Sequence, residues 1–238
     1  MQLLDFSAGS PEENLALDEA LLEAAENGTG QTTLRFWESS TYFVALGYTN
    51  RAHTETDLEE CKRRQIPILR RATGGGTVLQ GPGCFNYALV GTIEKGDSLN
   101  VGATNEFVMQ SVRGALNPLL NGEVELQGHT DLTWRGRKFS GNAQKRKARH
   151  FLFHGTILLG FDLELVQTTL RSPSKEPAYR AKRAHSEFIG NVPLERSAVK
   201  AVLAEAFGAT SVARARPDEL VRQLIEEKYA RNEWNRKF

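Results

Sequence analysis

Three consecutive glycines, Gly74-Gly75-Gly76, separate two runs of strand-forming residues and limit what the surrounding chain can form. The first run is Ile66-Pro67-Ile68-Leu69, and β-type residues resume at Thr77-Val78-Leu79. Glycine weakens helices and accepts positive φ, so this stretch is predicted to be a loop between strands. The amides of such a loop can turn together toward one anion. A plain hairpin turn or a flexible loop is the alternative.

A second unusual stretch, residues 135–150, holds seven lysines and arginines and no acidic residue. The whole chain is balanced, with 30 basic and 29 acidic residues, so the positive charge is concentrated locally. Lys138 lies there on a predicted short strand between Gly136 and Gly141. This pattern favours a phosphate or carboxylate ligand over a core position. For Lys145-Arg146-Lys147 we favour a solvated loop face, with contact to phosphate or to an acidic partner as the alternative.

Composition narrows the class of protein. A chain of 238 residues with 40% hydrophobic content can bury a full core, and we expect one catalytic domain over residues 1–238. No stretch approaches the ~18 to 20 apolar residues of a membrane span, and the N-terminus lacks a signal pattern. The only cysteines, Cys61 and Cys84, predict a reducing, cytoplasmic location. The balanced charge argues against a nucleic-acid partner.

The order of predicted elements is mixed rather than regularly alternating. Hydrophobic periodicity predicts helices over 14–27, 54–64, 104–116, 163–170, 197–207 and 218–231. Strand-forming runs occupy 32–38, 42–46, 66–69, 77–79, 85–92, 124–126, 131–134, 138–140 and 151–159. Residues 172–186, rich in proline and basic side chains, are predicted to be a mobile loop or linker. This order predicts an α+β fold with a mixed, largely antiparallel central sheet flanked by helices.

Five motifs, taken in order, resemble the lipoate-protein ligase family, within the larger group that includes biotin protein ligases and octanoyltransferases. They are the segments 70–76, 83–86, 130–132, 136–143 and 154–159. The resemblance implies a catalytic domain like that of biotin protein ligases and class II synthetases. It also implies that the C-terminal accessory domain of the bacterial ligase is absent, and that a separate small accessory subunit could replace it.

The resemblance implies an ATP-dependent lipoate-protein ligase. Such enzymes convert lipoate and ATP to lipoyl-AMP and transfer the lipoyl group to a lysine of a lipoyl domain, on 2-oxoacid dehydrogenase subunits or the glycine cleavage H protein. Lys138 matches the family's essential lysine, and Asp131 matches an acid that could contact Mg²⁺. The implied binding residues are Arg71, Thr73, Gly74, Gly75, Gly76, Val78, Asn86, Gly141, Asn142, Ala143, His154 and Thr156. A buried core histidine is the alternative for His154.

Two other functions stay open. One is an octanoyl- or lipoyl-transferase that uses a preformed acyl donor. The cysteine of such relatives lies near the position of Phe151 or in the loop where this chain has Gly128-His129-Thr130, and neither place holds cysteine. We therefore expect Cys84 to be a buried packing residue and Cys61 to be structural. The other is a non-catalytic acyl-adenylate-binding module, against which the retained Lys138 argues. Gln80 and Cys84 stand where the family often has His and Asn, which leaves the nucleotide contacts open.

Overall fold

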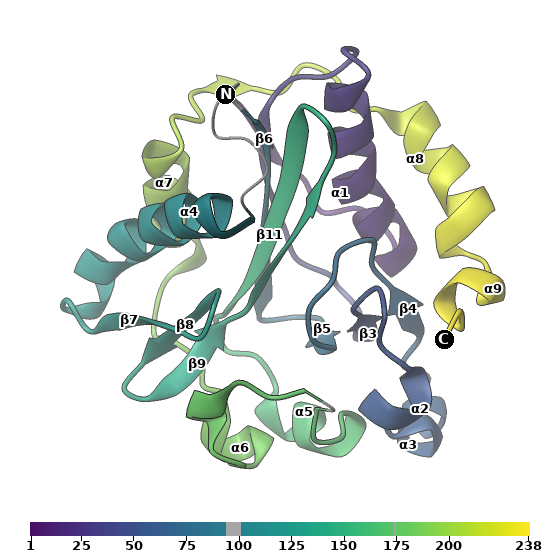
Figure 1. Cartoon of the computed structure of the whole chain (residues 1–238), viewed down its shortest axis with the longest axis vertical. Coiled ribbons are helices and arrows are strands. Elements are labelled where there is room, and N and C mark those ends of the chain that lie inside the picture. Colours follow the sequence, from purple (N-terminus) through teal and green to yellow (C-terminus); the bar gives the residue numbers. More distant parts are fainter. Residues whose placement is uncertain (94–100, 174) are drawn as a thin grey trace.

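The computed structural model describes residues 1–93, 101–173 and 175–238, and a six-stranded sheet forms its centre (Figure 1). The strand order is β10-β11-β6-β2-β1-β12. These strands are β1 (Gln2–Asp5), β2 (Thr33–Trp37), β6 (Cys84–Thr92), β10 (Asn142–Arg146), β11 (His150–Leu158) and β12 (Ser211–Val212). The pairings from β10 to β2 are antiparallel, whereas β1 runs parallel to both neighbours. The predicted mixed, largely antiparallel sheet is therefore confirmed.

Helices cover both faces of the central sheet. On one face lie α1 (Pro11–Glu26) and α8 (Asp218–Leu224), and on the other α4 (Val101–Leu116) and α7 (Arg196–Ala206) (Figure 1). Strand β6 contributes side chains to the hydrophobic cores on both faces of the sheet, because successive side chains of a strand point to opposite faces. Its Phe85, Tyr87 and Leu89 join the α4–α7 core, while Ala88 and Val90 join the α1 core. Each large side chain buried in this way contributes about 1.5–3 kcal/mol.

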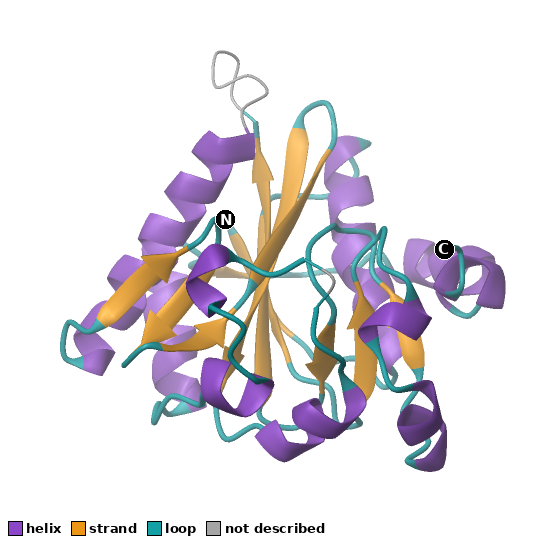
Figure 2. Ribbon diagram, turned by 60° about the horizontal axis from the view of Figure 1, so that its bottom comes forward, coloured by secondary structure: helices purple, strands orange, loops and turns teal. Residues whose placement is uncertain are grey.

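Two three-stranded sheets flank one end of β6 and β11 (Figures 1 and 2). One comprises β3 (Phe43–Leu46), β4 (Ile68–Arg70) and β5 (Val78–Gln80), and the other β7 (Val124–Gln127), β8 (Asp131–Trp134) and β9 (Arg137–Ser140). The remaining elements are short: α2 (Ala52–Glu55), α3 (Leu58–Arg63), η1 (Asn117–Leu120), α5 (Leu163–Thr169), η2 (Ala178–Arg180), α6 (His185–Phe188), the π-helix η3 (Ile225–Tyr229) and α9 (Asn232–Asn235). No helix among the described ranges is long and apolar enough to span a bilayer.

The helix predictions are correct in place but wrong in several boundaries. Helix α1 begins three residues before the predicted start, because Ser10 accepts a hydrogen bond from the Glu13 amide and proline suits the first turn. The single helix predicted over 54–64 is wrong, since α2 and α3 are separated there. Asp57 caps α3, and Thr56 forms a β-bridge with Leu170. The helix predicted over 218–231 ends early, in the π-helix η3.

The basic residues in and next to β10 do not form a solvated loop. Residues 142–146 form β10, which sequence analysis did not predict, and its partner β11 lies beside α1. Lys145 pairs with Glu19 and Lys147 with Glu23, both on α1. The interpretation of Lys145-Arg146-Lys147 as a solvated loop is therefore wrong. Residues 172–186, predicted to be a mobile loop, contain η2 and the start of α6, and only residue 174 of this range lies outside the described residues.

Candidate active site

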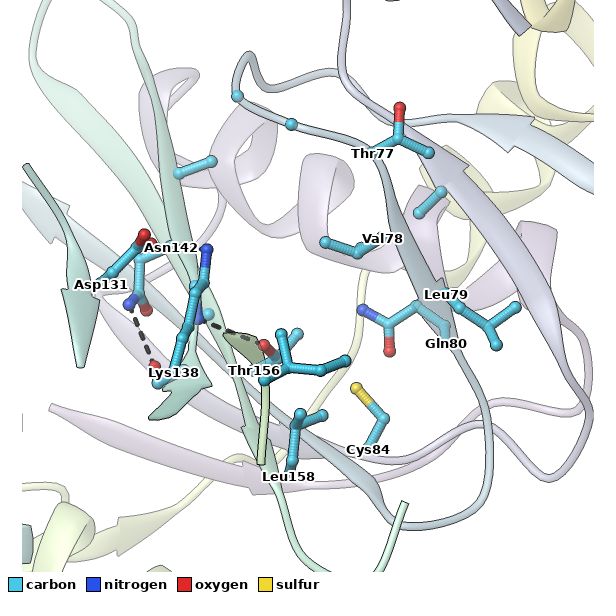
Figure 3. Close-up of a pocket in the computed structure, with 18 of the residues that line it drawn as sticks. Thr77, Val78, Leu79, Gln80, Cys84, Asp131, Lys138, Asn142, Thr156 and Leu158 are labelled. Atoms are coloured by element: carbon cyan, nitrogen blue, oxygen red, sulfur yellow. Dashed lines mark hydrogen bonds and ion pairs between the residues drawn. The ribbon is translucent and has the colours of Figure 1, made fainter. Parts of the chain in front are cut away.

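A cavity of about 330 Å³ lies where the glycine loop, strands β9 and β11, and the segment after α5 converge. All the predicted site residues line it except Thr73 and Gly74. Its apolar lining comes from separate elements: Trp37, Val78, Leu79, Phe139, Leu158, Phe161, Leu170 and Phe188. Figure 3 shows Lys138 and Asp131 on one side of this space and Gln80 with Leu79 across from them. The cavity therefore joins an apolar part to a charged part.

Lys138 projects from β9 across Gly141. A Cβ at Gly141 would lie 2.9 Å from Lys138 Cε, so glycine makes room for the lysine. The Gly141 amide in turn donates to Thr156 Oγ1 at 3.4 Å. Lys138 Nζ lies 2.8 Å from Asp131 Oδ1 (Figure 3), and the lysine side chain is 25% exposed. The Lys138 ammonium is thus paired with Asp131, and the lysine side chain lines the cavity.

Arg71 organises the glycine loop from within. Its Nε and Nη2 donate to the Gly74 carbonyl, and Nη2 also donates to the Gly76 carbonyl at 2.8 Å. Gly75 has φ +89° and its Cβ position would lie 2.9 Å from Arg71 Nη2, so a side chain there would be strained and crowded. Burial lowers the pKa of Arg71 to about 10, still well above neutral pH. No carboxylate of a described residue pairs with this cation, which suits it to an anionic ligand.

Thr73 and His154 belong to a buried chain of hydrogen bonds. Thr73 Oγ1 lies 2.7 Å from His154 Nε2, and His154 Nδ1 lies 3.1 Å from Asp18 Oδ2. Asp18 Oδ1 accepts a 2.6 Å bond from Arg35 Nη1, with both side chains buried. This chain ties the glycine loop to β11, α1 and β2. His154 is therefore partnered at both ring nitrogens and also borders the cavity.

Asn86 and Asn142 hold neighbouring groups in place. The amides of Asn86 and Gln80 exchange two hydrogen bonds of 2.8 and 2.9 Å, which satisfies both buried side chains. Asn142 Nδ2 donates to the Thr130 carbonyl, and Asn142 Oδ1 accepts from the Tyr87 hydroxyl. These contacts fix the start of β10 and the adjoining Gly141. Asn86 and Asn142 both line the cavity.

Both cysteines are buried, as expected. Cys84 borders the cavity but is only 1% exposed, and burial raises the pKa of its thiol, with a further contribution from Glu38. Cys61 packs in the cluster around β3 and α5 and lies on α3. Burial raises the pKa of its thiol to about 11. Neither environment stabilises a thiolate, which is the nucleophilic form.

Most of the predicted basic patch is neutralised outside the cavity. Of its seven lysines and arginines, Lys138 alone lines the cavity. Lys145, Lys147 and Arg149 pair with Glu19, Glu23 and Glu26 of α1, respectively. The prediction that the whole basic run contacts an anionic ligand is therefore wrong, because only Lys138 of this run lines the cavity. Within the described ranges no group of three His, Cys, Asp or Glu could hold a metal, and both Asp131 oxygens already have partners, Lys138 and Tyr179.

Several residues at the site were missed by sequence analysis. Asp18, Arg35 and Trp37 come from segments that were assigned only as a helix and a strand. Tyr179 comes from the segment predicted to be a loop, and its hydroxyl donates to Asp131 Oδ2 at 2.7 Å. The signal available for Asp18 was its position between Leu17 and Leu21 on a predicted amphipathic helix. A carboxylate on the apolar side of a helix needs a partner, and the structure shows Asp18 to be only 2% exposed.

Comparison with known proteins supports the resemblance. Residues 10–208 match the lipoyl protein ligase A/B catalytic domain. The chain is 31% identical to the octanoyltransferase LipM of Carboxydothermus hydrogenoformans, covering 100% of this chain and 98% of that protein. It is 28% identical to lipoate-protein ligase A subunit 1 of Thermoplasma acidophilum, covering 98% and 95%.

Solved structures agree with the fold. The chain superposes with a TM-score of 0.84 on a protein of the Thermoplasma acidophilum lipoylation system, which comprises a bi-partite lipoate protein ligase and its E2 lipoyl domain; identity is 25%, and coverage is 98% of this chain and 95% of that chain. A lipoate-protein ligase A bound with ATP gives 0.79 at 25% identity, covering 98% and 97%. The α+β fold predicted from the order of the elements is confirmed. The protein belongs to the lipoyl protein ligase A/B catalytic domain family.

Proposed function

We propose that this protein is an ATP-dependent lipoate-protein ligase, which forms lipoyl-AMP and transfers the lipoyl group to a lysine of a lipoyl domain. One observation carries the proposal. The cavity combines an apolar lining with several cations, among them Lys138 and Arg71, and contains no thiol in an environment that stabilises a thiolate. A medium-length acyl chain with a charged head group has this distribution of polarity, and an adenylate supplies activation without an enzyme nucleophile.

Lys138 is proposed to act at the carbonyl end of the acyl chain. Its ammonium would neutralise the α-phosphate during adenylation and the oxygen that gains charge when the acceptor amine attacks. A preorganised donor in a site shielded from water is more effective than the same donor in solution. The apolar side chains of Trp37, Leu158 and Phe161 would take the acyl tail.

The glycine loop and Arg71 are proposed to take the phosphate. Arg71 is held in place by two carbonyls of the loop, and its Nη1 donates to none of the described residues. The Cβ positions of Gly74 and Gly76 have no neighbour within 4 Å, so an anion could approach the backbone there. Mg²⁺ would be held mainly by phosphate oxygens, since both Asp131 oxygens already have partners, Lys138 and Tyr179.

The acceptor is proposed to be a lipoyl domain, and a second subunit is proposed to assist activation. Support for both comes from the Thermoplasma acidophilum system, in which a bi-partite ligase is described with an E2 lipoyl domain. This chain covers 95% of the curated subunit 1 of that organism. Lipoyl domains of 2-oxoacid dehydrogenase subunits and the H protein are the acceptors to try first.

An octanoyltransferase is the second candidate. The 31% identity to LipM favours it, and so does the position of Cys84 on the cavity wall. A thioester route would need the Cys84 thiol to lose its proton in a buried site beside Glu38, where its pKa is raised. The environment of Cys84 therefore argues for the ligase.

One experiment separates the two functions. Purified protein is mixed with an apo lipoyl domain and either lipoate with Mg-ATP or an octanoyl thioester of acyl carrier protein, and the acceptor is weighed by mass spectrometry. The ligase predicts lipoylation with ATP and pyrophosphate release, either alone or after a Thermoplasma-type second subunit is added. Octanoylation without ATP, with an acyl adduct on Cys84 that Cys84→Ser abolishes, would replace the ligase by the transferase.

A further inference from the structure

Tyr179 connects a segment distant in sequence to the side chain of Lys138. Its hydroxyl donates to Asp131 Oδ2 at 2.7 Å, while Asp131 Oδ1 lies 2.8 Å from Lys138 Nζ. The three side chains come from η2, β8 and β9. Burial, followed by the nearby Asp131 carboxylate, raises the pKa of the Tyr179 hydroxyl, so it is a hydrogen-bond donor at neutral pH.

The segment that carries Tyr179 is an ordered cap, which we define as residues 177–190. Phe188 is its centre: the Tyr179 ring lies 5.3 Å away, and the guanidinium groups of Arg180 and Arg183 lie over the Phe188 ring. Arg183 also donates to the carbonyls of Tyr179 and Gly136. The ring of Tyr179 is thus held by packing that does not depend on its hydroxyl.

The cap also contacts the backbone of Lys138. Ile189 forms a parallel bridge with Lys138, and the Gly190 amide donates to the Lys138 carbonyl at 2.9 Å. Cap residues 177, 180, 185, 188 and 189 also line the cavity. Lys138 is therefore attached to the cap twice, through its main chain and, by way of Asp131, through its ammonium group.

We propose that Tyr179 is a positioning residue that orients Lys138 through Asp131, and that it thereby couples the seating of the cap to the alignment of the reactive lysine. The proposal rests on the proposed acyl-transfer function and deepens it. A carboxylate held at only one oxygen can rotate about its last side-chain bond. With Tyr179 on the second oxygen, Asp131 is fixed, and the two remaining N–H bonds of Lys138 are directed into the cavity.

Tyr179→Phe tests this role because it removes one hydroxyl and keeps the ring on Phe188. With synthetic lipoyl-AMP as donor and an apo lipoyl domain as acceptor, we expect kcat to fall about tenfold, the effect of losing one hydrogen bond to a charged group. The KM for lipoyl-AMP should change less than twofold. Tyr42→Phe is the matched control, since Tyr42 packs on Phe161 without touching Lys138 or Asp131, and it should keep the wild-type kcat.

A double-mutant cycle shows whether Tyr179 acts through Asp131. In an Asp131→Ala background the hydroxyl has no carboxylate to orient, so adding Tyr179→Phe should not lower kcat further. A wild-type kcat in Tyr179→Phe, or a further tenfold loss in the double variant, would refute the proposal.

A readout without turnover separates this proposal from the proposed function. Reductive methylation of the free protein, followed by peptide mass spectrometry, reports how readily each lysine reacts. Lys138 should react at least threefold faster in Tyr179→Phe than in wild type, with Lys147 as the internal reference. If wild type transfers no acyl group but this difference is seen, the function is wrong and the orienting contact stands. If labelling of Lys138 is unchanged, the orienting contact is wrong.

Discussion

At the scale of single residues, the position of a lysine's acidic partner decides whether the lysine can contact a ligand in the cavity. Lys138 and Lys147 belong to one basic run, yet Lys147 is paired with Glu23 away from the cavity, while Lys138 reaches into it. Lys138 also has an acidic partner, Asp131, but that partner lines the same cavity. The location of each ion pair, rather than its existence, separates the two lysines.

Lys138→Ala should therefore lower both half-reactions at least ~10²-fold, the cost of losing one preorganised donor. Folding should be unchanged, because the side chain is partly exposed. Pyrophosphate release reports the first step, and lipoylation from supplied lipoyl-AMP reports the second. Lys147→Ala is the control from the same run and should keep both rates. Near-normal transfer from lipoyl-AMP by Lys138→Ala would remove Lys138 from the mechanism.

At the scale of elements, helix α1 supplies the acids that the basic run lacks. Glu19, Glu23 and Glu26 recur along it and meet Lys145, Lys147 and Arg149 near the β10–β11 hairpin. Glu19 also accepts from Lys228 and from the buried hydroxyl of Tyr229. The helix thus joins the N-terminal, central and C-terminal parts of the chain.

Glu19 should make the free energy of unfolding depend on pH in the acidic range. Burial alone would raise the pKa of Glu19, but Lys228 and Lys145 outweigh it and lower that pKa below 4.5. The stabilisation is therefore complete above about pH 4.5, the unfolded value, and is lost as pH falls through the folded pKa. Glu19→Gln should lower the free energy of unfolding by about 2 kcal/mol at pH 6.5.

The difference between wild type and Glu19→Gln should shrink when urea unfolding is repeated near pH 3. Glu123→Gln is the control, because its pair with Arg135 is exposed and should contribute little at either pH. A difference between wild type and Glu19→Gln that stays constant from pH 6.5 to pH 3 would contradict the assigned role.

Helix α1 and the strands of the central sheet show which features can be predicted from sequence. The helix over 14–27 and the strands over 85–92 and 151–159 follow from local periodicity, and the motifs around Gly75 and Lys138 each supply part of the cavity wall. The neutralisation of the basic run could not be predicted, since Glu19 lies 126 residues from Lys145. Tyr179 was missed for the same reason, because its partner Asp131 is 48 residues away.

At the scale of the whole molecule, Arg70 connects the C-terminal segment to the glycine loop. Its fully buried guanidinium donates to the carbonyls of Gly47, Tyr48 and Asn50 on one side and of Trp234 and Asn235 on the other. The 47–50 turn in turn holds the glycine loop, since the Tyr48 amide donates to the Thr73 carbonyl. A cavity wall is thus supported by residues from the far end of the chain.

Arg70→Met should destabilise the protein by at least about 3 kcal/mol, because several buried carbonyls lose their donor and each unsatisfied group costs about 1–3 kcal/mol. The measurement is the urea midpoint at constant m. Arg63→Met is the control, since that arginine is 66% exposed and pairs with Glu60 on the surface; its midpoint should stay near wild type. The Arg70 variant should also bind lipoyl-AMP more weakly under conditions where it remains folded, because the 47–50 turn no longer fixes the glycine loop. Wild-type stability with wild-type binding would show that the C-terminal segment packs against the loop without supporting it.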